Sequence, residues 1–115
     1  MIPKTIKIID RNRKVVATGQ VVKHEERFTG QLDLHSLANS LRQIFEEYEE
    51  IVNDQMFSLL DEIEEQINAL RLKVIFNEGE EAATEDLQIY PTTKRISFKL
   101  VKDSVELTIK EVMVG

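Results

Sequence analysis

The fold is decided by residues 34–71, which read LHSLANSLRQIFEEYEEIVNDQMFSLLDEIEEQINALR. Apolar side chains recur here in two runs at intervals of three and four residues, which is the period of an α-helix. The phase slips near Asn53-Asp54, where both side chains compete for backbone hydrogen bonds. A continuous helix would be about 57 Å long, whereas a domain of this size has a radius of gyration of roughly 13 Å. Either the helix breaks at this point or a second copy buries its overhang, and we favour the break.

The residues before this segment have the pattern of β-strands. Residues 6–9 and 14–17 are mostly apolar and flank the turn signal at residues 10–13, so they predict a hairpin. Thr18-Gly19 then predicts a bulge or a second turn. Residues 28–34 alternate with period two and predict a further strand.

The residues after the helical segment return to alternation, at residues 72–76, 87–89, 96–100 and 105–114. Strict alternation gives a strand one wet and one dry face, which is typical of antiparallel sheets. We therefore predict an α+β fold for the chain as a single domain, residues 1–115. In this two-layer sandwich, an antiparallel sheet, with about three strands before and four after, packs on a long or kinked helical segment at about residues 35–71.

Composition excludes several classes of protein. The 115 residues carry a net charge of −6 and contain no cysteine, which excludes a disulfide scaffold, a thiolate zinc site and a cysteine nucleophile. The four glycines are isolated and cannot form a phosphate-binding loop. Lys4 and Lys7 interrupt any secretory signal, and no apolar run is long enough to span a bilayer. We expect a soluble, cytoplasmic protein that does not bind membranes.

Charge is distributed unevenly along the chain. Residues 1–30 hold seven basic and three acidic side chains, whereas residues 31–70 hold one basic and ten acidic side chains. The basic hairpin could contact phosphate groups, although nothing aromatic precedes Phe28 to stack on bases, so nucleic acid is disfavoured as a partner. Its cations could equally protect an edge hairpin from aggregation. The candidate anion contacts are Lys4, Lys7, Arg11, Arg13 and Lys14.

The acidic side chains of the helical segment suggest a metal site as an alternative. Pairs such as Glu46 and Glu50 share one helical face and could bind Mg²⁺ or Mn²⁺ through oxygen atoms. The pattern Glu46-Glu47-x-x-Glu50 resembles the first half of the motif of MazG-like nucleotide pyrophosphohydrolases, an all-helical family. The second half of that motif ends in aspartate, where this chain has Glu62-x-x-Glu65. The prevailing interpretation is a solvated acidic face, with no metal site.

No other residues combine into a catalytic or cofactor site. His24 and His35, the two histidines, have no second ligand at a recognised spacing. No serine lies in a nucleophile-elbow sequence. We therefore expect no enzyme activity, no catalytic residues and no cofactor.

The apolar residues of the helical segment cover more than one face, which indicates a second contact surface. They could be covered by a curled sheet or by a protein partner, and the same curled sheet could enclose a pocket for a small ligand. We predict a small non-enzymatic interaction or assembly protein that forms a homo-oligomer (a dimer) or binds another protein, through these residues or an edge strand. A weak nucleic-acid-binding or regulatory module and a carboxylate metal-dependent hydrolase are the alternatives. The candidate interface residues are Phe45, Tyr48, Val52, Met56, Phe57 and Leu60.

Overall fold

Six antiparallel strands and a pair of helices make up the part of the chain that the computed structural model describes, residues 2–77 and 79–101. The helices lie between the third and fourth strands in the sequence. The elements are β1 (Lys4–Ile9), β2 (Val15–His24), β3 (Arg27–Asp33), α1 (Asn39–Asn53), the 3-10 turn η1 (Phe57–Leu59), α2 (Leu60–Ala69), β4 (Lys73–Phe76), β5 (Glu81–Tyr90) and β6 (Arg95–Leu100).

The predicted first hairpin is confirmed. β1 pairs with β2 from Lys4↔Val21 to Ile9↔Val15, with a bulge between Ile8 and Ile9. In the turn, Oδ1 of Asp10 accepts hydrogen bonds from the backbone N–H groups of residues 12 and 14, each at 2.9 Å. Such an aspartate turn satisfies backbone donors that the short loop leaves unpaired.

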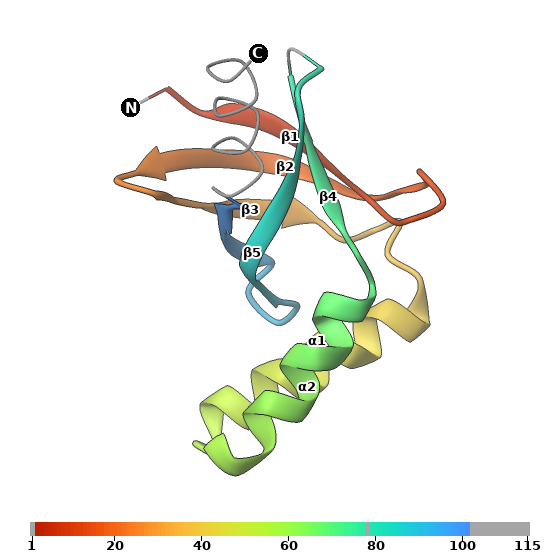
Figure 1. Ribbon diagram of the computed structural model, residues 1–115, viewed down its shortest axis with the longest axis vertical. Coiled ribbons are helices and arrows are strands. Elements are labelled where there is room, and N and C mark those ends of the chain that lie inside the picture. The colour runs from red at the N-terminus through yellow and green to blue at the C-terminus, as the bar shows by residue number, and fades with distance from the viewer. Residues whose placement is uncertain (1, 78, 102–115) are drawn as a thin grey trace, which may run out of the picture.

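The prediction of a two-layer sandwich is wrong, because the sheet closes on itself (Figure 1). The order of strands is β1-β2-β3-β6-β5-β4, and β4 pairs with β1 to complete a barrel. The helical segment does not cover a sheet face; it packs across one end of the barrel, where α1 contacts β5. Three strands precede and three follow the helices, and the strand expected at residues 105–114 lies outside the described residues.

Two glycines allow β2 and β3 to curve tightly around the barrel. A Cβ at Gly19 would lie 2.2 Å from the carbonyl oxygen of Gln31, and a Cβ at Gly30 would lie 1.9 Å from that of Gln20. Glycines at such close approaches permit the bending that closure of a sheet requires. The bulge or turn predicted at Thr18-Gly19 does not form, since β2 continues through both residues.

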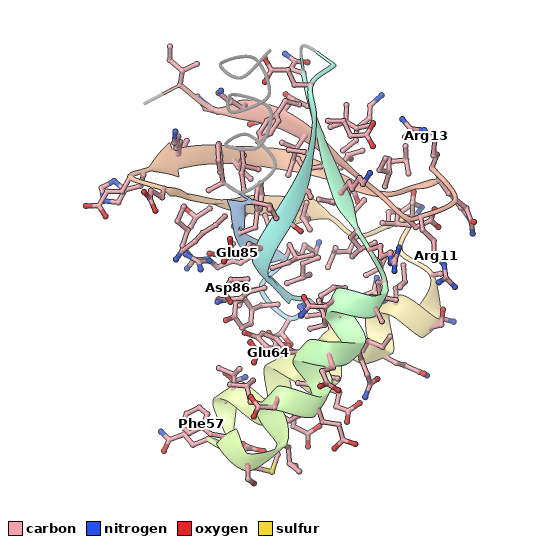
Figure 2. All side chains as sticks on the ribbon, viewed as in Figure 1. Arg11, Arg13, Phe57, Glu64, Glu85 and Asp86 are labelled. Atoms are coloured by element: carbon pink, nitrogen blue, oxygen red, sulfur yellow. The ribbon has the colours of Figure 1, made fainter. Side chains whose placement is uncertain are left out.

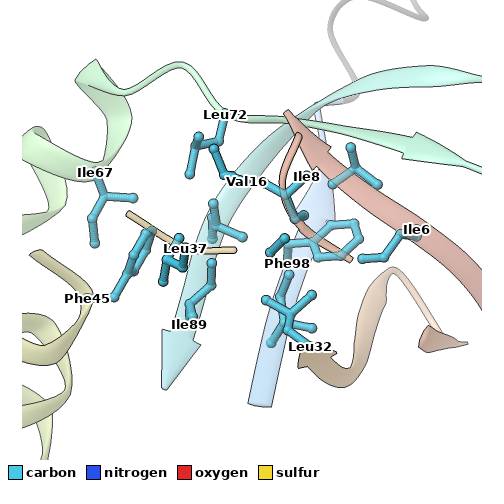
Figure 3. Close-up of a cluster of buried hydrophobic side chains, with 14 of the residues drawn as sticks. Ile6, Ile8, Val16, Leu32, Leu37, Phe45, Ile67, Leu72, Ile89 and Phe98 are labelled. Atoms are coloured by element: carbon cyan, nitrogen blue, oxygen red, sulfur yellow. The ribbon is translucent and has the colours of Figure 1, made fainter. Parts of the chain in front are cut away.

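The barrel and the helices share one hydrophobic core (Figure 3). Inside the barrel, the ring of Phe28 stacks on that of Phe98 at a centroid distance of 5.2 Å. At the helical end, Phe45 and Ile67 lie against the buried segment that carries Leu37. Residues 34–71 therefore bury their apolar stripe against the open end of the barrel.

The predicted break in the helical segment is confirmed. α1 ends at Asn53 and α2 begins at Leu60, so the chain reverses and the two helices pack side by side. We call residues 39–69 the helical arm; they extend from the barrel along the longest dimension of the molecule, 49 Å (Figure 1). None of the described helices has the length and apolarity needed to cross a membrane.

Candidate functional site

The distal end of the helical arm is a tight turn with defined backbone geometry. Gln55 has a φ of 58°, and the backbone N–H of Met56 donates to the carbonyl of Ile51 at 3.0 Å. The N–H of Gln55 donates to the carbonyl of Val52 at 3.2 Å. These two bonds around a left-handed residue form a Schellman motif, which terminates a helix and reverses the chain. Residues 54–59, which follow α1, are the arm tip.

The arm tip exposes large apolar side chains (Figure 2). Phe57 is 60% exposed and Leu59 is 45% exposed, and the described residues contain only two other large apolar side chains with comparable exposure, Ile2 and Val15. Exposure of a phenylalanine ring is unfavourable in water, at about 25 cal/mol per Å² of apolar surface. The tip is therefore a candidate contact surface.

The six predicted interface residues differ in how far they are buried. Phe45 and Tyr48 are buried within the chain, under the barrel, and are not available to a partner. Val52, Met56 and Leu60 are half-buried against the core. Phe57 is the only one of the six that is mostly exposed, because it lies off the helical stripe that faces the barrel.

At the other end of the arm, cations from two distant segments come together. Pairing of β1 with β4 places Lys73 opposite Ile9, next to the hairpin turn that carries Arg11. Arg71, in the link from α2 to β4, lines the same surface cavity as Arg11 and Lys73. We call the cations around the hairpin turn and the start of β4 the basic rim: Arg11, Arg13, Lys14, Arg71 and Lys73.

One acidic side chain neutralises part of the basic rim. The guanidinium of Arg13 donates two hydrogen bonds to the Glu81 carboxylate, both at 3.1 Å, and Nζ of Lys73 lies 3.5 Å from Oε1 of Glu81. The hydrogen bonds from Arg13 lower the pKa of Glu81, so this carboxylate stays charged. Arg11 and Lys14 form no ion pair with any described residue, and their charges remain available.

The remaining predicted anion contacts lie apart from this cluster. Nζ of Lys4 sits 5.5 Å from the centroid of the Phe76 ring, in a cation–π contact. Lys7 lies on the outer surface of β1, opposite Thr18 and Ile75. The structure therefore gathers three of the five predicted residues, Arg11, Arg13 and Lys14, and adds Arg71 and Lys73.

A pocket lies between the first hairpin turn and the base of the arm, and we call it the base pocket. Its volume is about 430 Å³. Val16, Leu41, Leu70 and Leu72 contribute apolar atoms to its lining, and Arg11 and Lys14 contribute positive charge. Asp10, Asn12, Ser36 and Ser40 also line it, so the pocket combines apolar and polar surface.

A second groove lies where α1 meets the turn between β5 and β6. It has a volume of about 460 Å³ and includes Glu49, Gln88 and Tyr90. Oε1 of Glu49, a side chain only 7% exposed, accepts hydrogen bonds from Thr92, so this carboxylate fastens the arm to the barrel. Burial, followed by the neighbouring Tyr90, raises the pKa of Tyr48 well above its usual range, so this phenol stays neutral.

Acidic groups also approach each other beside α2. Asp86 has a φ of 53° at an irregularity of β5 and is paired with Arg27, which also donates to the hydroxyl of Ser97. Burial, followed by the charge of Asp86, raises the pKa of Glu64 (Figure 2). The proximity of Glu64, on α2, to Asp86, on β5, is therefore electrostatically unfavourable when both carboxylates are charged.

The acidic residues considered for a metal site do not converge. Glu46, Glu47, Glu50, Glu62 and Glu65 are exposed, and the described residues contain no group of three His, Asp or Glu side chains suited to a metal ion. The mainly β fold also differs from the all-helical fold that the motif resemblance implies. This arrangement provides no support for the metal-hydrolase alternative.

Several residues of these sites were missed by the sequence reasoning. Arg71 and Lys73 join the basic hairpin only through the pairing of β1 with β4, which sequence periodicity does not encode. The predicted interface residues do not include Leu59, which is 45% exposed at the arm tip. No family model matches the chain, and no curated protein or solved structure matches it, so the candidate surfaces rest on the geometry described above.

Proposed function

We propose that the chain is a small non-enzymatic interaction protein that associates with a second copy of itself through the arm tip. The observation that carries the proposal is the 60% exposure of Phe57 at the end of the arm. Aromatic side chains of this kind dominate the binding energy of protein interfaces. An edge-strand contact is less favoured, because every described strand pairs with a neighbour on each side.

Charge supports a second copy as the partner. The tip contains Asp54 and is followed by Asp61 and Glu62, whereas the barrel carries the basic rim. Complementary charges orient two surfaces and select the partner. Each chain carries both an acidic surface at the tip and a basic surface on the barrel. Two copies can therefore pair these surfaces without any other protein.

Sedimentation equilibrium on the wild-type protein and on Phe57→Ser tests the proposal. We expect the wild type to self-associate at about 100 µM or below, and the substitution to raise the dissociation constant at least about tenfold. Ile2→Ser is the matched control, since Ile2 is also an exposed apolar residue but lies outside the arm. A wild-type protein that remains monomeric, or equal effects of both substitutions, would contradict the proposal.

The basic rim supports a second candidate function, contact with a polyanion. The observation that favours it is the arrival of Arg71 and Lys73 beside the hairpin. Phe57, the only mostly exposed aromatic residue described, lies far from the rim, so binding would involve phosphates without base stacking (Figure 2). Affinity for a labelled oligonucleotide should then fall steeply with salt and fall again in Arg11→Glu; no binding at low salt excludes this candidate.

A further inference from the structure

We infer that the arm tip of one copy inserts into the base pocket of a second copy, and that the two copies do this reciprocally. The inference rests on the proposed self-association and identifies the surface that receives the tip. It makes the association a two-fold dimer with two equivalent contacts. Each chain contributes one tip and one pocket.

The chemistry of the base pocket matches the chemistry of the tip. The pocket offers apolar side chains, among them Leu41, Leu70 and Leu72, to an entering aromatic ring. A concave site that combines such apolar side chains with polar groups is typical of ligand pockets and of the pockets that receive interface anchors. Its volume of about 430 Å³ leaves room for a large apolar side chain such as Phe57.

The charges around the two surfaces are opposite in sign. Arg11 and Lys14 line the pocket and form no ion pair with any described residue. Asp10 also lines it, but its Oδ1 accepts backbone hydrogen bonds within the hairpin turn. Asp54, in the tip, and Glu62, shortly after it, likewise form no ion pair within the described chain. Docking of the tip in the pocket brings these opposite charges together. This favours contact between tip and pocket over contact between two acidic tips.

The length of the arm allows both contacts to form at once. The pocket is lined by the first turn of α1 and the last residue of α2, and the tip lies at the opposite end of the same helices (Figure 2). Two arms placed antiparallel therefore bring each tip to the other's pocket, at a separation of about 22 Å for the 15-residue α1. A contact that is repeated by a two-fold axis closes at the dimer.

Three samples test the inference by sedimentation equilibrium: the tip variant Phe57→Glu, the pocket variant Ala69→Trp and their equimolar mixture. Phe57 and Ala69 are both exposed, so neither substitution disturbs the core, and circular dichroism checks the fold. Ala69 lines the pocket, and an indole ring there fills it. We expect each variant alone to bind itself at least about tenfold more weakly than the wild type.

The mixture supplies the decisive result. The pocket variant keeps its tip and the tip variant keeps its pocket, so together they form one of the two contacts, and the mixture should associate more strongly than either variant alone. If Ala69→Trp associates like the wild type while Phe57→Glu does not, the inference fails and the proposed function stands. If the mixture shows no gain, the inference also fails. A monomeric wild type overturns both.

Discussion

The carboxylate of Glu49, in the middle of α1, accepts two hydrogen bonds from Thr92 in the turn between β5 and β6. The Thr92 hydroxyl lies 2.6 Å and its backbone nitrogen 3.3 Å from the same oxygen, Oε1. Hydrogen bonds to a charged group contribute more to stability than bonds between neutral groups. Residues that are 43 positions apart in the sequence thereby fix the arm against the barrel.

Removal of this acceptor should destabilise the protein. We expect Glu49→Ala to lower the free energy of unfolding by about 1.5–3 kcal/mol, because it deletes hydrogen bonds to a buried charge. Urea denaturation measures the change. Glu50→Ala is the control, since Glu50 is the exposed neighbour on the same helix and should change stability by about 0.5 kcal/mol or less. Equal effects of the two substitutions would show that the contact with Thr92 is not stabilising.

The stability of the chain should also depend on Glu64. Its pKa is raised in the folded protein above the ordinary value of 4.5, first by burial and then by Asp86. The folded state therefore holds this proton more tightly than the unfolded state, and stability falls as the pH rises from the unfolded pKa through the folded pKa. Below that window the group is neutral in both states and the cost disappears.

Glu64→Gln should consequently raise the urea midpoint at pH 7, and the gain should shrink at about pH 3.5. Glu62→Gln provides the control on the same helix, because Glu62 is exposed. A gain for Glu64→Gln that is independent of pH would contradict the electrostatic explanation.

The tight approach of β2 and β3 predicts that Gly30 cannot carry a side chain. Gly30→Ala should cost about 2–3 kcal/mol, since its Cβ would meet a backbone carbonyl that cannot move without opening the barrel. Gly79→Ala is the comparison: its Cβ would meet nothing, and only its φ of 91° opposes the change, at about 1 kcal/mol. Thermal denaturation ranks the two; the reverse order would argue against a steric role for Gly30.

The left-handed residue at the arm tip predicts a stabilising substitution. Gln55 has a φ of 58°, which glycine adopts without strain, so Gln55→Gly should raise the free energy of unfolding by about 0.5–1 kcal/mol. Asn53→Gly, within the last turn of α1, should instead lower it by a similar amount. Urea denaturation of both variants checks the signs, and a loss of stability in Gln55→Gly would contradict the Schellman geometry.

Local features of this chain followed from the sequence, but the closure of its sheet did not. The first hairpin and the helix break at Asn53-Asp54 depend on turn residues and on a slip of phase, both of which are local signals. Alternation of apolar and polar residues gives a strand one dry face, and that face suits an open sheet under a helix as well as the inside of a barrel. Gly19 and Gly30 distinguish the two, but only once their facing carbonyls are known.

The candidate surfaces, like the fold, were predictable only where they depend on residues that are close in the sequence. Phe57 stood out because it lies off the helical stripe, and the cations of the first hairpin are close together in the sequence. The burial of Glu49 was concealed among its acidic neighbours, since its partner, Thr92, lies in a distant turn. The base pocket was concealed for the same reason, because its walls come from β1–β2, α1 and the end of α2.

Burial of the arm tip on association is the central claim, and a single tryptophan measures it directly. The chain contains no tryptophan, so Phe57→Trp places the only indole at the tip and keeps an aromatic anchor there. We predict that its emission maximum moves to shorter wavelength as the protein concentration rises to about 100 µM, in parallel with the dimer fraction from sedimentation. An emission maximum that remains that of a solvent-exposed indole while the dimer forms, or over the whole range with no dimer, would contradict the account.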